Sequence, residues 1–186
     1  MTYWHEHPPA HHALPGLAQI IPTLHTDRLT LRAPGLSDFP LLVEIDASVA
    51  DVSLRAQNGR TGTWEDFMQM TATWLLRGHG WWTVDDNAGA VGFVGLGFEP
   101  GDQEPELGYL FAASARGKGY ATEACMAART HARDTAGLPS LVSYISDGNT
   151  ASQNVARKLG AQRDPAAEAA LDETGVQVWR HWGGEV

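Results

Sequence analysis

Cysteine is almost absent from this chain, whose 186 residues include a single one, Cys125. An internal disulfide is therefore excluded. No apolar run approaches the roughly 20 residues of a membrane-spanning helix, and the N-terminus lacks the apolar core of a signal peptide. We therefore expect a protein of the reducing cytoplasm that does not bind a membrane.

Basic residues are also scarce, because 13 Lys and Arg stand against 22 Asp and Glu and give a net charge of −9. A nucleic-acid binder needs a basic face, so this balance argues against one. An acidic surface suits a cationic substrate, although it can equally serve only solubility.

Two nucleotide-binding motifs are missing. No segment matches the phosphate-loop pattern G-x-x-x-x-G-K-S/T, which argues against a nucleotidase of that class. The segment GLGFEP at residues 95–100 begins like a dinucleotide fingerprint, but Pro100 stands where the third glycine belongs. Internal repeats are absent as well.

The composition, with 43% apolar and 19% charged residues, is that of one soluble globular domain with a sizeable core. Residues 1–22 are predicted to be a Pro/His-rich N-terminal tail, and residues 23–186 the domain. The tail contains His5, His7, His11 and His12. Because no Cys or acidic cluster at ligand spacing accompanies them, a loosely docked arm is favoured over a metal site.

Hydrophobic periodicity over residues 24–182 predicts an α/β domain. The expected order is a strand, two helices, three strands, a helix, a strand, a helix and one or two strands. In the second helix, Thr63 and Asp66 resemble a weak capping pair. An apolar stripe follows, and we expect it to be buried; it consists of Trp64, Phe67, Met68, Thr71, Trp74 and Leu75.

The segment ELGYLFAASARGKGYATEA at residues 106–124 carries the strongest functional signal. It predicts a strand that runs through a glycine-rich turn into a helix, whose first N–H groups and dipole attract anions. Gly117 and Gly119 let a phosphate approach the backbone, and Arg116 and Lys118 add cationic donors. A cradle for a diphosphate is the functional interpretation, and a plain flexible turn is the alternative. Cys125 falls on the apolar face of this helix, which favours a small buried residue over a nucleophile.

Three segments resemble one family. Arg116-x-x-Gly119-x-Ala121 resembles the Q/R-x-x-G-x-G/A acetyl-CoA signature of the GNAT N-acetyltransferases. The run GKGYATEA resembles the RimJ/RimL-like branch, which acetylates the N-termini of ribosomal proteins. The segments TDRLTLR at 26–32 and NTASQNVARKLG at 149–160 resemble the same branch. The matches stand in the expected order and together span about residues 24–182.

The resemblance implies a single domain with a mixed six- to seven-stranded sheet, splayed at the acetyl-CoA site and flanked by about four helices. Acetyl-CoA is then the co-substrate, and no metal is required. The residues implied to bind it are Leu110, Phe111, Arg116, Gly117, Lys118, Gly119, Tyr120, Ala121, Asn149 and Ser152. The partner is an amine, either a peptide N-terminus or a small molecule, and the protein is expected to be a monomer or a homodimer.

Acetyl transfer needs a neutral amine, a stabilised carbonyl oxygen and a stabilised leaving thiolate. An α-amine is about 10% neutral at pH 7, against about 0.04% for lysine. The chain has no obvious His–carboxylate pair, which favours an α-amine acceptor. The predicted base is Glu106 on the central strand, and an exposed strand carboxylate without a role is the alternative.

The resemblance implies an oxyanion contact to a backbone N–H near Leu110 or Phe111. Many family members use a tyrosine as the acid, but Ala156 stands at that place here. The RimL-like pattern shifts the role to Ser152, with Asn149 bonding the pantetheine arm or ordering its loop. A helix-start serine that bonds only backbone is the alternative.

Three functions remain open at this stage. The first is an acetyl-CoA-dependent N-acetyltransferase of the RimJ/RimL-like kind. The second is a non-catalytic acyl-CoA-binding module with the same fold. The third is an enzyme that acetylates a small amine such as a polyamine, an antibiotic or an amino-sugar. The stretches that would choose the acceptor are the least like the family pattern, so the sequence does not identify it.

Overall fold

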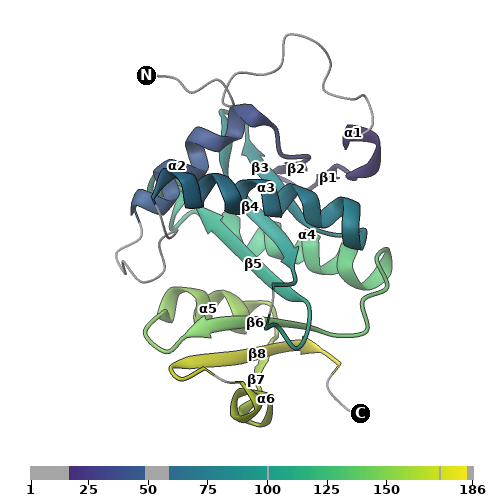
Figure 1. The fold of residues 1–186 in the computed structure, drawn as a ribbon, viewed down its shortest axis with the longest axis vertical. Coiled ribbons are helices and arrows are strands. Elements are labelled where there is room, and N and C mark those ends of the chain that lie inside the picture. The colour runs from purple at the N-terminus through teal and green to yellow at the C-terminus, as the bar shows by residue number, and fades with distance from the viewer. Residues whose placement is uncertain (1–16, 49–58, 100, 172, 184–186) are drawn as a thin grey trace.

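A single mixed sheet runs through the whole protein (Figure 1). The structure, a computed structural model, describes residues 17–48, 59–99, 101–171 and 173–183. The sheet has eight strands in the order β1-β2-β3-β4-β5-β6-β8-β7. Their bounds are β1 Leu24–His25, β2 Thr30–Arg32, β3 Trp81–Asp86, β4 Gly89–Gly97, β5 Glu106–Phe111, β6 Leu141–Ser146, β7 Gln162–Arg163 and β8 Val176–Trp182.

The pairing confirms the expected mixed α/β class. Neighbouring strands are antiparallel except β5 and β6, which run parallel. A parallel neighbour requires a crossover connection, and the helix α4 provides it between β5 and β6. The two-residue strands β1 and β7 extend the sheet beyond the six or seven strands expected from the sequence.

Helices cover both faces of the sheet. They are α1 Leu17–Ile20, α2 Phe39–Ser48, α3 Arg60–Arg77, α4 Tyr120–Asp134, α5 Thr150–Lys158 and α6 Pro165–Ala170. In Figure 1, α2 and α3 lie in front of β4 and β5, whereas α4 lies behind them. Among the described residues, no helix is long and apolar enough to cross a bilayer.

The core is divided by the sheet. On the α4 side, the small residues of the helix let it approach the strands closely, and Ala124, Cys125 and Ala128 are fully buried there. Burial raises the pKa of the Cys125 thiol, so the prediction of a small buried residue is confirmed. The second cluster lies under α2 and α3, where aromatic rings stack edge to face around Phe39 and Phe67.

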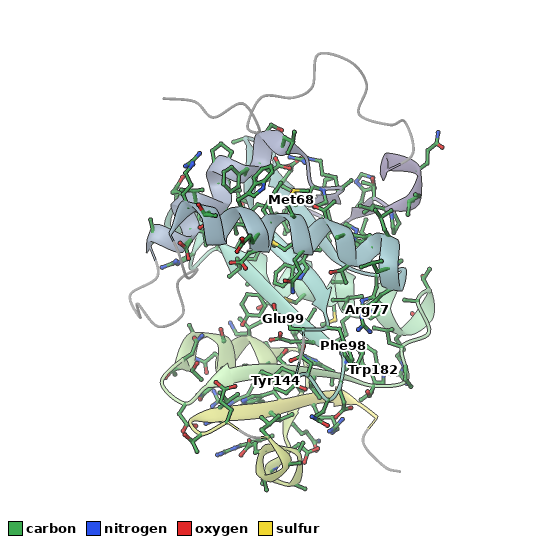
Figure 2. All side chains as sticks on the ribbon, in the orientation of Figure 1. Met68, Arg77, Phe98, Glu99, Tyr144 and Trp182 are labelled. Carbon is green, nitrogen blue, oxygen red and sulfur yellow. The ribbon has the colours of Figure 1, made fainter. Side chains whose placement is uncertain are left out.

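The helix α3 departs from the sequence prediction in two ways. It begins at Arg60 with Gly59 as its N-cap, so Thr63 is not the cap; the Thr63 hydroxyl instead donates to the Gly59 carbonyl at 3.2 Å. The buried stripe is Phe67, Met70 and Trp74. Met68 and Leu75, expected in that stripe, are 45% and 60% exposed. Residues i, i+3 and i+7 face the sheet, and Met68 and Leu75 each lie one position past a buried residue, on the exposed side of the helix. Figure 2 labels Met68 on this side of α3.

The predicted tail at residues 1–22 lies mostly outside the described residues, and so do its four histidines. Its last residues include α1 and Ile21, whose side chain is 1% exposed. Ile21 packs into the cluster on the α4 side together with Leu29 and Leu31. Ile21 therefore already belongs to the packed core, and the boundary between tail and domain at residue 22 stays a prediction.

Candidate active site

The sheet opens between β5 and β6. The ladder between these strands, both fully described, holds one residue pair, Glu106 with Val142. Near it, the Ser143 hydroxyl donates to the Leu107 carbonyl at 2.7 Å. Beyond Leu107 the strands diverge, and Figure 1 shows β6 leaving β5 at a wide angle. The edge of β5 that faces β6 is therefore open for a ligand to pair with.

Strand alternation identifies the backbone groups along this open edge. The Ala112 N–H donates to the Val91 carbonyl of β4 at 3.0 Å. Because alternate residues of an antiparallel ladder bond to the same neighbour, the Leu110 N–H also faces β4. The N–H groups of Tyr109 and Phe111 then face the opening. Of the two residues suggested from the sequence for the oxyanion contact, the geometry favours Phe111.

A cavity of about 810 Å³ lies beside this opening. Its lining includes nine of the ten residues that the sequence implied for acetyl-CoA, namely Leu110, Phe111, Arg116, Gly117, Gly119, Tyr120, Ala121, Asn149 and Ser152. Lys118 is not in the lining; its ammonium lies 5.7 Å from the centroid of the Tyr120 ring. We refer to this space as the cofactor cavity.

The turn at the start of α4 has the backbone of an anion cradle. Gly117 and Gly119 have φ angles of 77° and 81°, which side chains rarely allow, and nothing lies within 4 Å of a Cβ built at Gly117. Gly119 is the N-cap of α4, so the free N–H groups of the first helical turn follow it directly. Arg116 is partly engaged, since its guanidinium donates to the Phe111 carbonyl at 3.4 Å and to the Ser48 hydroxyl at 3.1 Å.

A cluster between the first strands and α4 supports this turn, and sequence reasoning missed it. The Arg28 guanidinium binds the Glu123 carboxylate, with Nε to Oε2 at 2.7 Å, and donates to the Lys118 carbonyl at 2.9 Å. The Thr26 hydroxyl donates to Glu123 Oε1 at 2.6 Å. All of these residues had a signal, because they belong to the TDRLTLR and GKGYATEA runs of the family resemblance.

The helix α5 borders the cofactor cavity on the other side. Asn149 is its N-cap, because the Asn149 side chain accepts a hydrogen bond from the Ser152 N–H at 3.0 Å. Of the two roles suggested for Asn149, this contact fits the ordering of the loop. Ser152 lies in the first turn, half-buried, and its role as an acid stays a prediction.

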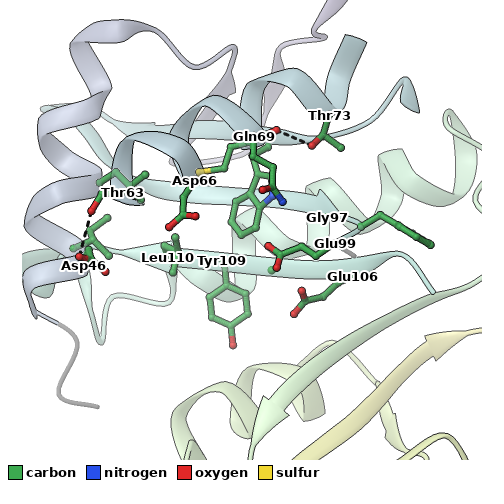
Figure 3. A pocket seen from close by; sticks show the side chains of 16 residues that line it. Asp46, Thr63, Asp66, Gln69, Thr73, Gly97, Glu99, Glu106, Tyr109 and Leu110 are labelled. Carbon is green, nitrogen blue, oxygen red and sulfur yellow. Dashed lines mark hydrogen bonds between the residues drawn. The ribbon is translucent and has the colours of Figure 1, made fainter. Parts of the chain in front are cut away.

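A second cavity, of about 310 Å³, lies on the α2–α3 side of β5 (Figure 3). It shares Ile45, Tyr109 and Leu110 with the cofactor cavity, so the two spaces meet at these residues. Its lining carries four carboxylates, Asp46, Asp66, Glu99 and Glu106, and among the described residues of the lining there is no Lys or Arg. We refer to it as the acidic cavity.

Trp81 forms one wall of the acidic cavity and explains two glycines of the sheet. A Cβ at Gly95 or at Gly108 would overlap the indole ring of Trp81. The ring therefore packs directly on the backbone of β4 and β5. The indole also contributes an apolar, electron-rich surface beside the carboxylates.

Burial and mutual repulsion raise the pKa values of three of these acidic groups. Burial, with repulsion from Asp102 and Glu99, raises the pKa of Glu106 to about 8, and only a backbone hydrogen bond at Tyr144 opposes it. Burial and neighbouring carboxylates also raise the pKa values of Asp66 and Glu99. A cation in this cavity would relieve that repulsion, and Glu106 can exchange a proton near neutral pH.

A metal site finds no support in the described part of the chain, which contains no group of three His, Cys, Asp or Glu residues able to hold an ion. His131 and His181 are buried away from both cavities. His131 packs against the rings of Trp74 and Trp82, and His181 lies 3.2 Å from the Ser143 hydroxyl.

Comparisons with known proteins agree with this geometry. A family model described as "Acetyltransferase (GNAT) domain" matches residues 28–162. An acetyltransferase from Agrobacterium tumefaciens str. C58 is 36% identical, with a TM-score of 0.78 over 87% of this chain and 95% of that chain. A GNAT-family acetyltransferase from Bacillus anthracis is 18% identical, with a TM-score of 0.65 over 85% and 96% of the two chains.

The ribosomal L7/L12 α-N-protein acetyltransferase RimL, solved in complex with coenzyme A, is 20% identical. Its TM-score is 0.64, over 86% of this chain and 97% of that chain. A search of curated proteins finds no match. The family model covers well over half of the sequence, and the chain therefore belongs to the GNAT acetyltransferase family.

Proposed function

We propose that this protein transfers the acetyl group of acetyl-CoA to a primary amine, which attacks the thioester directly. The observation that carries the proposal is the meeting of two cavities at Ile45, Tyr109 and Leu110. One cavity has the anion cradle and the other has the carboxylates. A thioester at the junction is within reach of an amine on the acidic side.

The cofactor arrangement follows from the open edge of β5. The diphosphate binds the N–H groups from Gly117 to Ala121, where the helix dipole favours negative charge. The amide groups of the pantetheine pair with the backbone of β5 that β6 leaves free. The carbonyl oxygen of the acetyl group accepts a hydrogen bond from the Phe111 N–H as negative charge develops on it.

Glu106 serves as the base. It lies in the lining of the acidic cavity on the strand that ends at the junction. An α-amine has a pKa near 8, and the carboxyl pKa of about 8 matches it. Proton transfer between groups of equal pKa is nearly balanced, so Glu106 takes the proton directly or through one water.

The acceptor is a primary amine, either a protein N-terminus as in the RimJ/RimL-like branch or a small molecule. The carboxylates around the acidic cavity favour an amine that is positively charged before it reacts. The cytoplasmic location and the monomeric or homodimeric state remain predictions.

Free-thiol release from acetyl-CoA with a panel of peptides and small amines tests this proposal. We expect turnover with at least one amine, and kcat/KM that rises with pH through about 8 and then levels. Glu106→Gln keeps the side-chain shape but cannot accept a proton. It should lower the rate about 100-fold at pH 7. The loss should be smaller above pH 9, where most of the amine is already neutral and needs no base.

Two results would contradict the proposal. Acetyl-CoA binding without turnover of any amine would favour a non-catalytic acyl-CoA-binding module. A profile of Glu106→Gln that runs parallel to the wild type at every pH would remove Glu106 as the base.

A further inference from the structure

Tyr109 is the polar side chain at the point where the two cavities meet. The shared lining consists of Ile45, Leu110 and Tyr109, and the first two are hydrocarbon. If the thioester lies at this junction, as the proposed function requires, the phenol is the side-chain donor nearest to it. Figure 3 shows the ring of Tyr109 projecting from β5 on the side away from Asp66 and Glu99, which is also the side of the Glu106 side chain.

The hydroxyl of Tyr109 lies on the cofactor side of the strand. It donates to the Ser152 carbonyl in the first turn of α5, at 3.4 Å. This distance is longer than the usual range for such a bond, so the contact is weak. The hydroxyl can therefore turn to a better acceptor between β5 and α5 at little cost.

We infer that Tyr109 donates a hydrogen bond to the sulfur of coenzyme A and stabilises the thiolate as the thioester breaks. In this step the amine nitrogen bonds to the carbonyl carbon, and the carbon–sulfur bond breaks with its electron pair passing to sulfur. The proton lost by the amine goes to Glu106. The thiolate later takes that proton through water, which restores the carboxylate.

Tyr109 keeps its own proton throughout. Burial raises the pKa of its phenol well above the usual value near 10. A thiol has a pKa near 8.5, so full transfer from the phenol to the thiolate is uphill. A hydrogen bond to the developing charge needs no transfer and acts mainly in the transition state and in the product complex.

The test measures the pKa of the thiol of bound coenzyme A, followed by the ultraviolet absorbance of the thiolate. We expect it to be about one unit lower in the wild type than in Tyr109→Phe, which corresponds to a tenfold stabilisation of the thiolate. Tyr144→Phe is the matched control, because Tyr144 lines neither of the two cavities, and it should leave the thiol pKa unchanged. This measurement needs no acceptor, so it stands apart from the proposed function.

Turnover supplies a second readout with the best amine of the panel. Tyr109→Phe should lower kcat about tenfold while the dissociation constant of acetyl-CoA stays within about twofold. An equal thiol pKa in wild type and Tyr109→Phe would overturn the inference. So would a loss of rate explained wholly by weaker binding of acetyl-CoA, which would assign Tyr109 to packing. If coenzyme A binds with the expected thiol pKa but no amine reacts, the proposed function fails and the inference stands.

Discussion

Burial changes the chemistry of single side chains in opposite directions in this protein. It raises the pKa of Glu106 to about 8, and together with Arg129 it lowers the pKa of His181 to about 4. Both effects disfavour the charged form. The hydroxyl of Ser143 donates to the Leu107 carbonyl, so it accepts from Nε2–H of His181. The other ring nitrogen, Nδ1, is buried without a partner among the described residues.

The neutral state of His181 makes stability depend on pH. The unfolded chain binds a proton at pH 6.5 and the folded chain only near pH 4. The unfolded state therefore holds more protons between these values, and stability falls as the pH falls. Across this window the free energy of unfolding should drop by about 3 kcal/mol through His181 alone.

His181→Asn removes this titration and keeps an N–H for Ser143. We expect the variant to lose about 3 kcal/mol less than the wild type between pH 7 and pH 4, as measured by denaturant unfolding. Comparing the two proteins cancels the contribution of the other titrating groups, including His131, to the pH dependence of stability. Parallel stability curves would show that His181 is not the group responsible.

At the scale of elements, the connection between the first strands and α4 holds the anion cradle in place. Arg28 reaches from the turn between β1 and β2 to Glu123 on α4 and to the carbonyl of Lys118 in the cradle. The Arg28 side chain is 51% exposed, so the ion pair adds little to global stability. In the proposed function, its effect is to fix the backbone of the turn before the diphosphate of acetyl-CoA binds.

Arg28→Ala should therefore weaken acetyl-CoA binding more than it weakens the fold. We expect the dissociation constant to rise about fivefold, in line with the net contribution of about one hydrogen bond, with a small change in melting temperature. Arg163→Ala is the matched control, because Arg163 also forms an exposed ion pair, with Glu168, and has the same 51% exposure. It should leave binding unchanged. Equal effects of the two variants would assign Arg28 to general stability.

At the scale of the whole molecule, the net charge of −9 and the acidic cavity act in the same direction. The field of an acidic protein concentrates cations near its surface. In the proposed function Glu106 takes the proton of the reacting amine, whereas Asp66 and Glu99 are exposed residues of the same cavity. Burial and then repulsion from neighbouring carboxylates raise their pKa values, and a second positive charge on the acceptor would relieve that repulsion.

Acceptors with a second positive charge should therefore react faster than neutral analogues of equal length. We expect kcat/KM for a diamine to exceed that for the monoamine about tenfold at low ionic strength, and the ratio to fall with salt. Asp66→Asn should lower the ratio about threefold. Asp134→Asn changes the net charge equally outside this cavity and should leave the ratio unchanged. An undiminished ratio in Asp66→Asn would place the selection elsewhere.

The local sequence pattern was enough to predict most of the helices and strands and the glycine turn before α4. Alternation and helical periodicity depend on neighbouring residues, and the segment 106–124 carries strand, glycine turn and helix in one stretch. Where a prediction failed, packing decided. The orientation of α3 on the sheet selects Met70 over Met68, and Gly59 begins the helix before Thr63.

The sequence by itself determined the fold class, the family and nine of the residues around the cofactor cavity. Only the tertiary structure decided how distant segments combine. The divergence of β5 from β6 opens the cofactor cavity, and α2 and α3 close the acidic cavity over the other face of β5. The junction at Tyr109, the high pKa of Glu106 and the support from Arg28 all depend on residues brought together from far along the chain. No local pattern records such contacts, because burial and electrostatic repulsion arise only once the chain is packed.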